Sequence, residues 1–247
     1  MGESIRNAAR RTGVAQAITS RERKRANVIE EAPGPAKGGG FDVRAFLSFA
    51  GLNKKSMDFP KNKVVFAAGD SAENVLFIQK GIVKLSVTSG QGKTAVMTIL
   101  GSGNFFGVWC LAGQLRRTAT ATTMAPTTVS VIPKEQMLRL LHSVPDFSDH
   151  FITFLLKRNI RFGRQVVNFL FDSTEKKLIR ALLFLAQFGI ESGDDVTMFR
   201  VPQELLGEMI GTSRTHVNTF MTKLKRLGFI EYNSGLRIHR TPLMSLL

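Results

Sequence analysis

One segment of the chain, from Pro202 to His239, restricts the possible folds more than any other. Apolar residues recur three and four positions apart on both sides of Gly211-Thr212-Ser213, which predicts two short amphipathic helices joined by a tight turn. The run Asn233-Ser234-Gly235 then predicts a β-hairpin with strands over 229–233 and 236–239. A helical hairpin inside an ordinary core would have the same spacing, but the added β-hairpin favours a winged helix-turn-helix.

The second of these helices, expected from Ser213 to Gly228, divides into an apolar and a polar face. Ser213 is a favourable N-cap because its hydroxyl can accept a hydrogen bond from an early backbone N–H. The apolar residues are Val217, Phe220, Met221, Leu224 and Leu227. The opposite face carries Arg214, Thr215, Asn218, Thr219, Thr222, Lys223, Lys225 and Arg226. One buried face and one face of hydrogen-bond donors are typical of a helix that enters the major groove of DNA.

The composition favours an anionic partner. The 247 residues contain 34 lysines and arginines but 19 aspartates and glutamates, a formal net charge of +15, which favours nucleic acid or another anionic surface. Cys110 is the single cysteine, so one chain can form neither an intramolecular disulfide framework nor a cysteine-based metal cluster. No apolar run approaches the roughly 18 residues of a membrane span, and the N-terminus lacks an apolar signal core. We therefore expect a cytoplasmic protein that does not enter a membrane.

Motifs of the common catalytic classes are missing from the sequence. The chain has no phosphate-binding P-loop, no nucleophile elbow and no cluster of metal-ligand residues. We therefore expect neither an enzyme nor a resident metal or cofactor.

Residues 1–40 have the composition of a basic tail and linker. Arginines are scattered among small polar residues, and the segment ends in prolines and glycines over 33–40. We expect this segment to be disordered. An additional DNA-contacting arm is the alternative, and the sequence does not distinguish the two.

Residues 41–144 are expected to form a β-rich domain. A short helix is predicted over 43–50, and turn signals such as Gly90-Gln91-Gly92 separate the β-rich runs that follow. The predicted strands are 64–66, 75–79, 82–87, 94–100, 118–123 and 127–132. Short strands at near-regular spacing predict an antiparallel barrel or jelly roll, a fold that often holds a small ligand.

Residues 145–172 are expected to form one long helix. Its apolar residues are too many for a lone surface helix, and such a helix commonly pairs with a copy of itself as a coiled coil. We expect a homodimer through residues 147–171, and the alternative is packing on its own β-rich domain alone. Residues 173–247 are expected to form the winged helix-turn-helix domain, which begins with a helix over 175–188 and a loop over 191–195.

This order of a β-rich domain, a long helix and a winged helix-turn-helix resembles the Crp/Fnr family of bacterial transcription regulators over about residues 41–245. The segments that carry the resemblance are Phe77-Ile78-Gln79-Lys80-Gly81, Gly101-Ser102-Gly103-Asn104-Phe105-Phe106-Gly107, Arg117-Thr118-Ala119 and Gly207-Glu208-Met209-Ile210-Gly211-Thr212-Ser213-Arg214. The resemblance implies a β domain of the cyclic-nucleotide-binding type, a dimer through the long helix and an inverted-repeat site in double-stranded DNA. An activator of this family would also contact RNA polymerase, and no segment here marks such a surface.

The resemblance also identifies candidate effector-binding residues. Members that bind cyclic AMP hold its phosphate with a Gly-Glu pair at a helix start and with an Arg-Ser or Arg-Thr pair, while the Glu binds the ribose hydroxyl. Gly107, Arg117 and Thr118 match this pattern. Val108 stands in the place of the Glu and cannot accept a hydrogen bond from the sugar. The site is therefore expected to be degenerate for cyclic AMP.

A second departure lies on the long helix. Phe162 and Gly163 replace the Thr-Ser pair that meets the adenine in the family's cyclic AMP responders. We expect another small anionic or cyclic nucleotide effector, or none. Cys110, beside the Gly107-Val108 segment, is either a thiol sensor or simply a small buried residue. Two further alternatives stay open: a regulator that binds DNA only with a cyclic nucleotide, and a ligand-binding module that acts on a protein partner.

The family pattern assigns roles on the second helix of the helix-turn-helix. A Ser-Arg-Glu run opens that helix in the family, and its Arg and Glu contact base edges. Here Arg214 matches, Thr215 replaces the Glu and Thr219 stands at a later Arg position. Arg214 is expected to donate to O6 and N7 of guanine, and Asn218 to read adenine. Phosphate contacts are expected from Ser213, Thr222, Lys223, Arg237 and His239.

Overall fold

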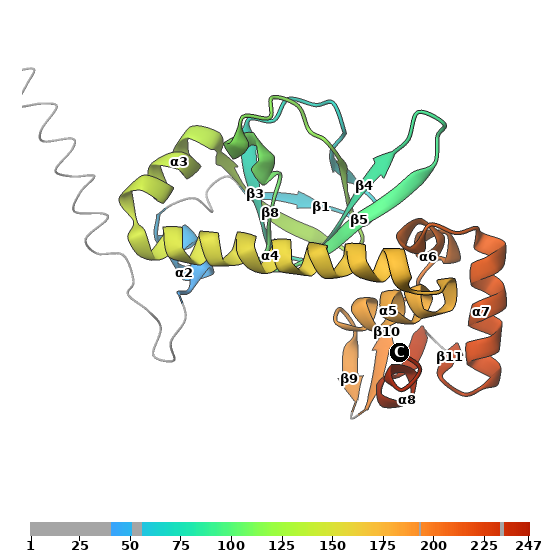
Figure 1. The fold of residues 1–247 in the computed structure, drawn as a ribbon. Coiled ribbons are helices and arrows are strands. Elements are labelled where there is room, and N and C mark those ends of the chain that lie inside the picture. The colour runs from blue at the N-terminus through green and yellow to red at the C-terminus, as the bar shows by residue number, and fades with distance from the viewer. Residues whose placement is uncertain (1–40, 51–55, 193, 233–234) are drawn as a thin grey trace, which may run out of the picture.

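The computed structural model describes residues 41–50, 56–192, 194–232 and 235–247. The predicted basic tail and linker (1–40) and two residues of the predicted hairpin turn (233–234) lie outside the described residues. A β-rich unit precedes one long helix, and a helical unit with a small sheet follows it, so the predicted α+β architecture is confirmed (Figure 1). We call residues 41–144 the β unit and residues 173–247 the C-terminal unit.

The β unit contains two four-stranded antiparallel sheets. The first has the order β1-β8-β3-β6, with β1 (Ser56–Phe59), β8 (Thr127–Pro133), β3 (Asn74–Lys80) and β6 (Phe105–Phe106). The second has the order β2-β7-β4-β5, with β2 (Val64–Phe66), β7 (Thr120–Thr123), β4 (Ile82–Thr88) and β5 (Thr94–Gly101). Ile78 of the first sheet and Val83 of the second share one buried cluster, so the sheets pack face to face. The jelly roll is confirmed, but the described strands do not close into the predicted barrel.

Several short elements are absent from the prediction. The sequence pattern gives no β1 or β6, no helix α3 (Lys134–Ser143) and no helix α8 (Arg240–Met244). Pro133 is the N-cap of α3, and Pro145 opens the next helix, so both prolines mark helix starts rather than a loop. The predicted helix over 43–50 is confirmed as α2 (Val43–Phe49).

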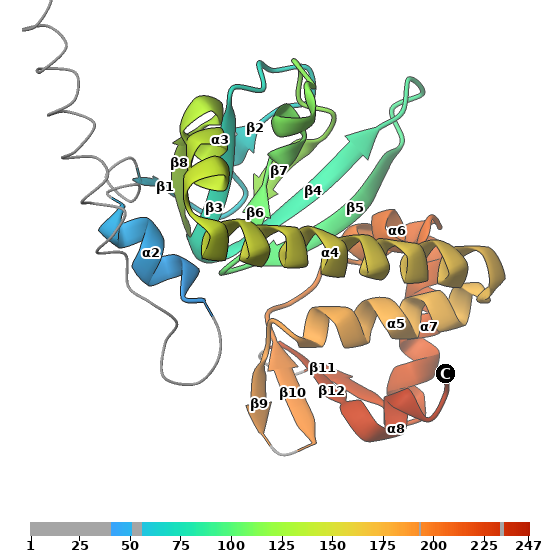
Figure 2. The same cartoon turned by 60° about the vertical axis from the view of Figure 1, so that its left-hand side comes forward.

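The long helix α4 (Pro145–Phe171) extends along the β unit and reaches the C-terminal unit (Figures 1 and 2). Phe147 and Phe151 in its first half are buried, with ring centres 6.2 and 5.4 Å from that of Phe105. Apolar side chains elsewhere on α4 are largely exposed in the single chain: Ile152, Leu156, Ile160, Phe162, Val166, Val167, Phe169, Leu170 and Phe171. The aromatic contacts thus fix one part of α4 on β6 and leave an apolar surface on the rest.

The C-terminal unit combines four helices with a four-stranded antiparallel sheet of order β11-β12-β10-β9 in the described chain. Its helices are α5 (Thr174–Ala186), α6 (Gln203–Ile210), α7 (Arg214–Arg226) and α8. Its strands are β9 (Ile190–Ser192), β10 (Asp195–Met198), β11 (Ile230–Tyr232) and β12 (Leu236–His239). The predicted helix-turn-helix and hairpin are confirmed. The predicted loop over 191–195 is wrong, because β9 and β10 pair with each other and β10 pairs with β12.

The two units share part of one core. Ile99 of β5 and Met124 of the β unit lie in the same buried cluster as Leu206 of α6. At this contact Lys84 Nζ lies 3.1 Å from Glu208 Oε2, and both side chains are mainly buried. The C-terminal unit is therefore packed against the β4–β5 hairpin as well as joined to α4.

Candidate nucleic-acid interface and effector site

Glycines build the turn between α6 and α7. Gly211 ends α6 with a φ of 71°, in the left-handed region that favours glycine. Gly207 packs against the turn, and a β-carbon added there would lie 2.7 Å from the carbonyl oxygen of Thr212. Ser213 then caps α7, and its hydroxyl accepts a hydrogen bond from the His216 N–H at 3.3 Å, as the sequence predicts. The start of α7 is thus fixed by local contacts.

Helix α7 has one buried and one exposed face. Val217, Met221 and Leu224 are buried in the core of the C-terminal unit. Leu227 is mostly exposed, contrary to the prediction, because it is the C-cap of α7 and lies beyond the last buried turn. We call five of its exposed side chains the reading face: Arg214, Thr215, Asn218, Thr219 and Thr222. Helix α7 lies at the edge of the molecule, on the opposite side of the C-terminal unit from β9 (Figure 1).

Side chains of α6 hold two residues of the reading face. Arg214 Nη1 lies 2.9 Å from Glu204 Oε1. Asn218 Oδ1 accepts a hydrogen bond from the side-chain amide of Gln203 at 3.0 Å. Neither Gln203 nor Glu204 is among the site residues predicted from the sequence. Their polar character at the start of the first helix is the signal that could have found them, since that helix packs across the second.

The basic residues predicted to contact phosphates are paired with carboxylates of the protein itself. Lys223 Nζ lies 2.8 Å from Glu175 Oε1. Arg237 Nη2 and His239 Nδ1 lie 2.7 and 2.6 Å from the two carboxylate oxygens of Asp195. The hydrogen bond with His239, together with Arg237, holds the pKa of Asp195 below its usual range. A DNA phosphate must therefore compete with these carboxylates.

The predicted effector residues meet at the start of a 3-10 helix, η2 (Val108–Ala112). Gly107 is its N-cap with a φ of 68°, and the Arg117 guanidinium packs against it. Arg117 is only 8% exposed and donates to the carbonyl oxygens of Gly107 at 3.0 Å and Asn74 at 2.8 Å. Its guanidinium also lies 4.4 Å from the ring centre of Phe66. Within the described chain Arg117 forms no ion pair and its Nε has no hydrogen-bond partner, so it is a buried cation with a spare donor.

The other predicted effector residues differ in exposure. Val108 is buried, whereas Thr118 is exposed beside Arg117. Cys110 is buried and its thiol donates to the Gly107 carbonyl at 3.3 Å. Burial raises the pKa of this thiol, which keeps it protonated and poorly reactive. These properties favour a packing role for Cys110 over thiol sensing.

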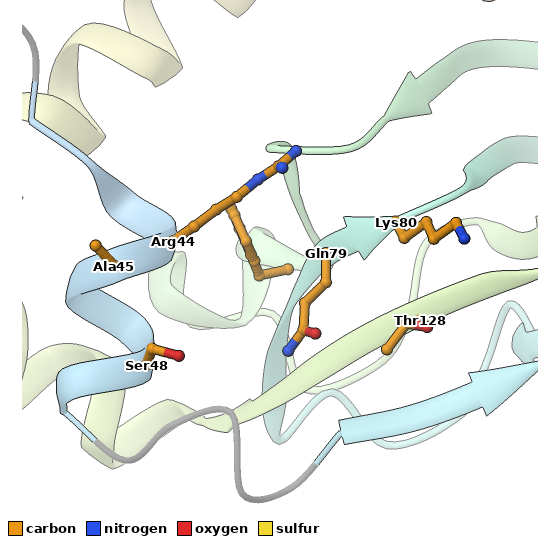
Figure 3. A pocket seen from close by; sticks show the side chains of 7 residues that line it. Arg44, Ala45, Ser48, Gln79, Lys80 and Thr128 are labelled. Carbon is orange, nitrogen blue, oxygen red and sulfur yellow. The ribbon is translucent and has the colours of Figure 1, made fainter.

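A hollow of about 500 Å³ lies elsewhere on the β unit, between α2 and the strands β3 and β8 (Figure 3). Its lining residues are Arg44, Ala45, Ser48, Phe77, Gln79, Lys80 and Thr128. The Gln79 amide is already bonded to Ser130 Oγ at 2.6 Å. None of the predicted effector residues lines this hollow.

Two family models match the two units of the chain. The model of the cyclic nucleotide-binding domain matches residues 56–144, and the model of the Crp-like helix-turn-helix domain matches residues 176–244. The chain belongs to the Crp/Fnr family. It is thus a DNA-binding transcription regulator, in which a cyclic-nucleotide-binding-type unit precedes the winged helix-turn-helix.

Several known proteins resemble this chain over most of their length. The CRP-like cAMP-activated global transcriptional regulator of Mycobacterium tuberculosis is 26% identical over 187 residues, which is 74% of this chain and 84% of that protein. The global nitrogen regulator of a Nostoc species is 26% identical over 192 residues, 76% of this chain and 86% of that protein. The structure of FixK2 from Bradyrhizobium japonicum has a TM-score of 0.66 at 13% identity, with 77% of this chain and 96% of that chain covered.

The described residues add two negative findings. No group of three or more His, Cys, Asp or Glu side chains in them is arranged to hold a metal ion. None of their helices combines the length and the apolar character needed to cross a membrane.

Proposed function

We propose that this Crp/Fnr regulator is a homodimer that binds an inverted-repeat DNA site through its two reading faces. One observation carries the proposal: the polar side chains of the reading face are exposed, while the opposite face of α7 is buried. Arg214 and Asn218 lie one helical turn apart on the exposed face, a spacing that suits neighbouring base pairs. In this proposal Arg214 binds guanine and Asn218 binds adenine.

Phosphate contacts would complete the interface. Ser213 and Thr222 are exposed next to the base-reading residues and keep the role that the sequence predicts for them. Lys223, Arg237 and His239 would exchange their protein carboxylates for DNA phosphates. This exchange makes the affinity strongly dependent on salt.

The exposed apolar surface of α4 supports the dimer. Leu156, Ile160, Gly163, Val167 and Leu170 follow the alternating spacing of four and three residues that defines a coiled-coil seam. A β-carbon added at Gly163 would meet open space in the single chain. Glycine at the seam would therefore allow close approach of the two helices.

The β unit is proposed to respond poorly to cyclic AMP. Buried Val108 offers the ribose no acceptor, and the donors of Arg117 are already bound to backbone carbonyls. The unpaired charge of Arg117 still favours a small anion beside Gly107. A different anionic effector, or regulation without one, fits this site better than cyclic AMP.

Selection from a randomised pool of double-stranded DNA, with and without cyclic AMP at one salt concentration, tests the proposal. We expect the same inverted repeat in both selections, with half-sites about 34 Å apart. Enrichment only with cyclic AMP would overturn the effector proposal. Failure to enrich any sequence would contradict the proposed DNA recognition.

The substitution Ile160→Glu tests the dimer separately. Because Ile160 is 56% exposed in the single chain, the change is expected to leave the fold intact and to place two like charges in the α4 seam. Sedimentation should then show monomers. Leu115→Glu, an equally polar change at an exposed leucine of the β unit, is the matched control and should remain dimeric.

A further inference from the structure

Two adjacent residues at the start of α6 contact the two proposed base readers on α7. Glu204 pairs with Arg214 at 2.9 Å, and Gln203 donates to Asn218 at 3.0 Å. Both contacts occur in the protein without DNA, and each involves a different base reader.

These contacts contribute little to stability. The side chains of Arg214 and Glu204 are 71% and 56% exposed, and exposed ion pairs are nearly neutral for folding because water screens them. Their effect is on geometry: Arg has many rotamers, and a carboxylate on one side limits the directions in which its guanidinium points. Asn218 has an analogous restriction, because donation from Gln203 to Oδ1 leaves its NH₂ group directed away from α6.

We propose that Gln203 and Glu204 are specificity-determining positions, which orient Asn218 and Arg214 for base reading. The inference rests on the proposed function, because it assigns partners to the two base readers named there. Glu204 has a second effect. Its negative charge beside Arg214 opposes binding to the DNA backbone, so Arg214 is less available for arbitrary phosphates than for a guanine edge that accepts two hydrogen bonds.

Substitutions at the two positions should change base preference independently of each other. Glu204→Gln keeps the size of the side chain and removes its charge. We expect it to weaken the preference for guanine at the Arg214 position about two- to fivefold and to increase affinity for random DNA. Gln203→Ala should weaken the preference for adenine at the Asn218 position by a similar factor and leave the guanine position unchanged.

Glu208→Gln is the matched control on the same helix. Glu208 pairs with Lys84 of the β unit and not with α7, so its variant should keep the wild-type base preferences. The readout is relative affinity for the selected half-site and its single-base variants, measured on the full-length protein. If Gln203 and Glu204 only stabilised α6, their variants would lower binding to all DNA sites equally.

The outcomes separate this inference from the proposed function. If the wild type prefers no sequence, the proposed function fails and this inference fails with it. If the wild type is specific but Glu204→Gln and Gln203→Ala keep its base preferences, the inference alone is overturned. A change in Glu208→Gln as large as in Glu204→Gln would also overturn it.

Discussion

Two arginines of this regulator, one in each unit, show opposite uses of the same side chain. Arg117 is buried in the β unit, stacks on Phe66 and donates to two backbone carbonyls. Arg214 is exposed on α7, and an exposed carboxylate is its ion-pair partner. Burial lowers the pKa of Arg117, because desolvation disfavours its charged form.

The difference shows how the surroundings decide what an arginine does. A guanidinium bound to backbone carbonyls stabilises the fold, and it can bind a ligand only if those hydrogen bonds break. A guanidinium paired with a mobile carboxylate exchanges partners at little cost. The β unit therefore encloses the arginine that we propose as an anion-binding residue, whereas the C-terminal unit leaves the proposed base reader Arg214 exposed.

The largest expected effect comes from Arg117→Ala. Two backbone carbonyls each lose a charged donor, at about 1–3 kcal/mol each, so the free energy of unfolding should fall by about 3 kcal/mol in urea denaturation. Arg116→Ala, a change at the exposed neighbour, should stay within about 0.5 kcal/mol of the wild type. Equal stability of the two variants would contradict the structural role of Arg117, because its guanidinium would then be free to bind a ligand.

Arg214→Ala should lower DNA binding and leave stability nearly unchanged. Unfolding free energy is expected to stay within about 0.5 kcal/mol of the wild type, because the side chain is exposed. Binding to the selected site should weaken by about 1–3 kcal/mol, with little change on random DNA. Arg226→Ala at the end of α7 is the control, and it should weaken binding to the selected site and to random DNA alike. Equal losses of affinity for the selected site and for random DNA would instead show that Arg214 contacts phosphates.

Asp195→Asn sharpens the comparison within the C-terminal unit, because it removes the nearest carboxylate from Arg237 and His239 and leaves them only the more distant Glu231. DNA affinity should rise about two- to fivefold at low salt and less at high salt. The folded-state pKa of Asp195 is lowered, so its carboxylate stabilises the fold above the unfolded-state value of about 3.9 and loses this effect as the pH falls. The variant should unfold more easily at neutral pH and respond less to acid. Unchanged affinity would show that the carboxylate does not restrain the wing.

The smallest expected effect is that of alkylating Cys110 on DNA binding. Its buried thiol has a raised pKa, so iodoacetamide should modify the folded protein far more slowly than the protein in urea. DNA binding measured before and after the treatment should be the same. Rapid modification with a loss of binding would restore thiol sensing and show that this part of the β unit opens.

Local signals account for the parts of the site that the sequence predicts. Gly211 and Ser213 set the end of α6 and the start of α7 through their own backbone and hydroxyl, so the pattern places both helices correctly. The Arg117 position follows from the family motif. Its bonds to Gly107 and Asn74 do not, because they depend on how distant segments pack.

Elements formed by long-range pairing escape the sequence pattern. β6 has two residues, too few for any period, and exists through its pairing with β3. β9 and β10 lie in a polar, glycine-containing stretch and are ordered by pairing with each other and with β12. The partners of Arg214 and Asn218 were missed for the same reason, since Gln203 and Glu204 reach them only after α6 and α7 pack together.

The shared core of the two units has a consequence for how such regulators can be recombined. Ile99 and Met124 complete the hydrophobic interior of the C-terminal unit, and Lys84 meets Glu208 at its edge. A chimera joined at the end of α4 would bring a foreign winged helix-turn-helix against this surface without its matching side chains. A chimera that keeps this interior packed would therefore also need matching side chains at the Ile99 and Met124 positions of the β unit.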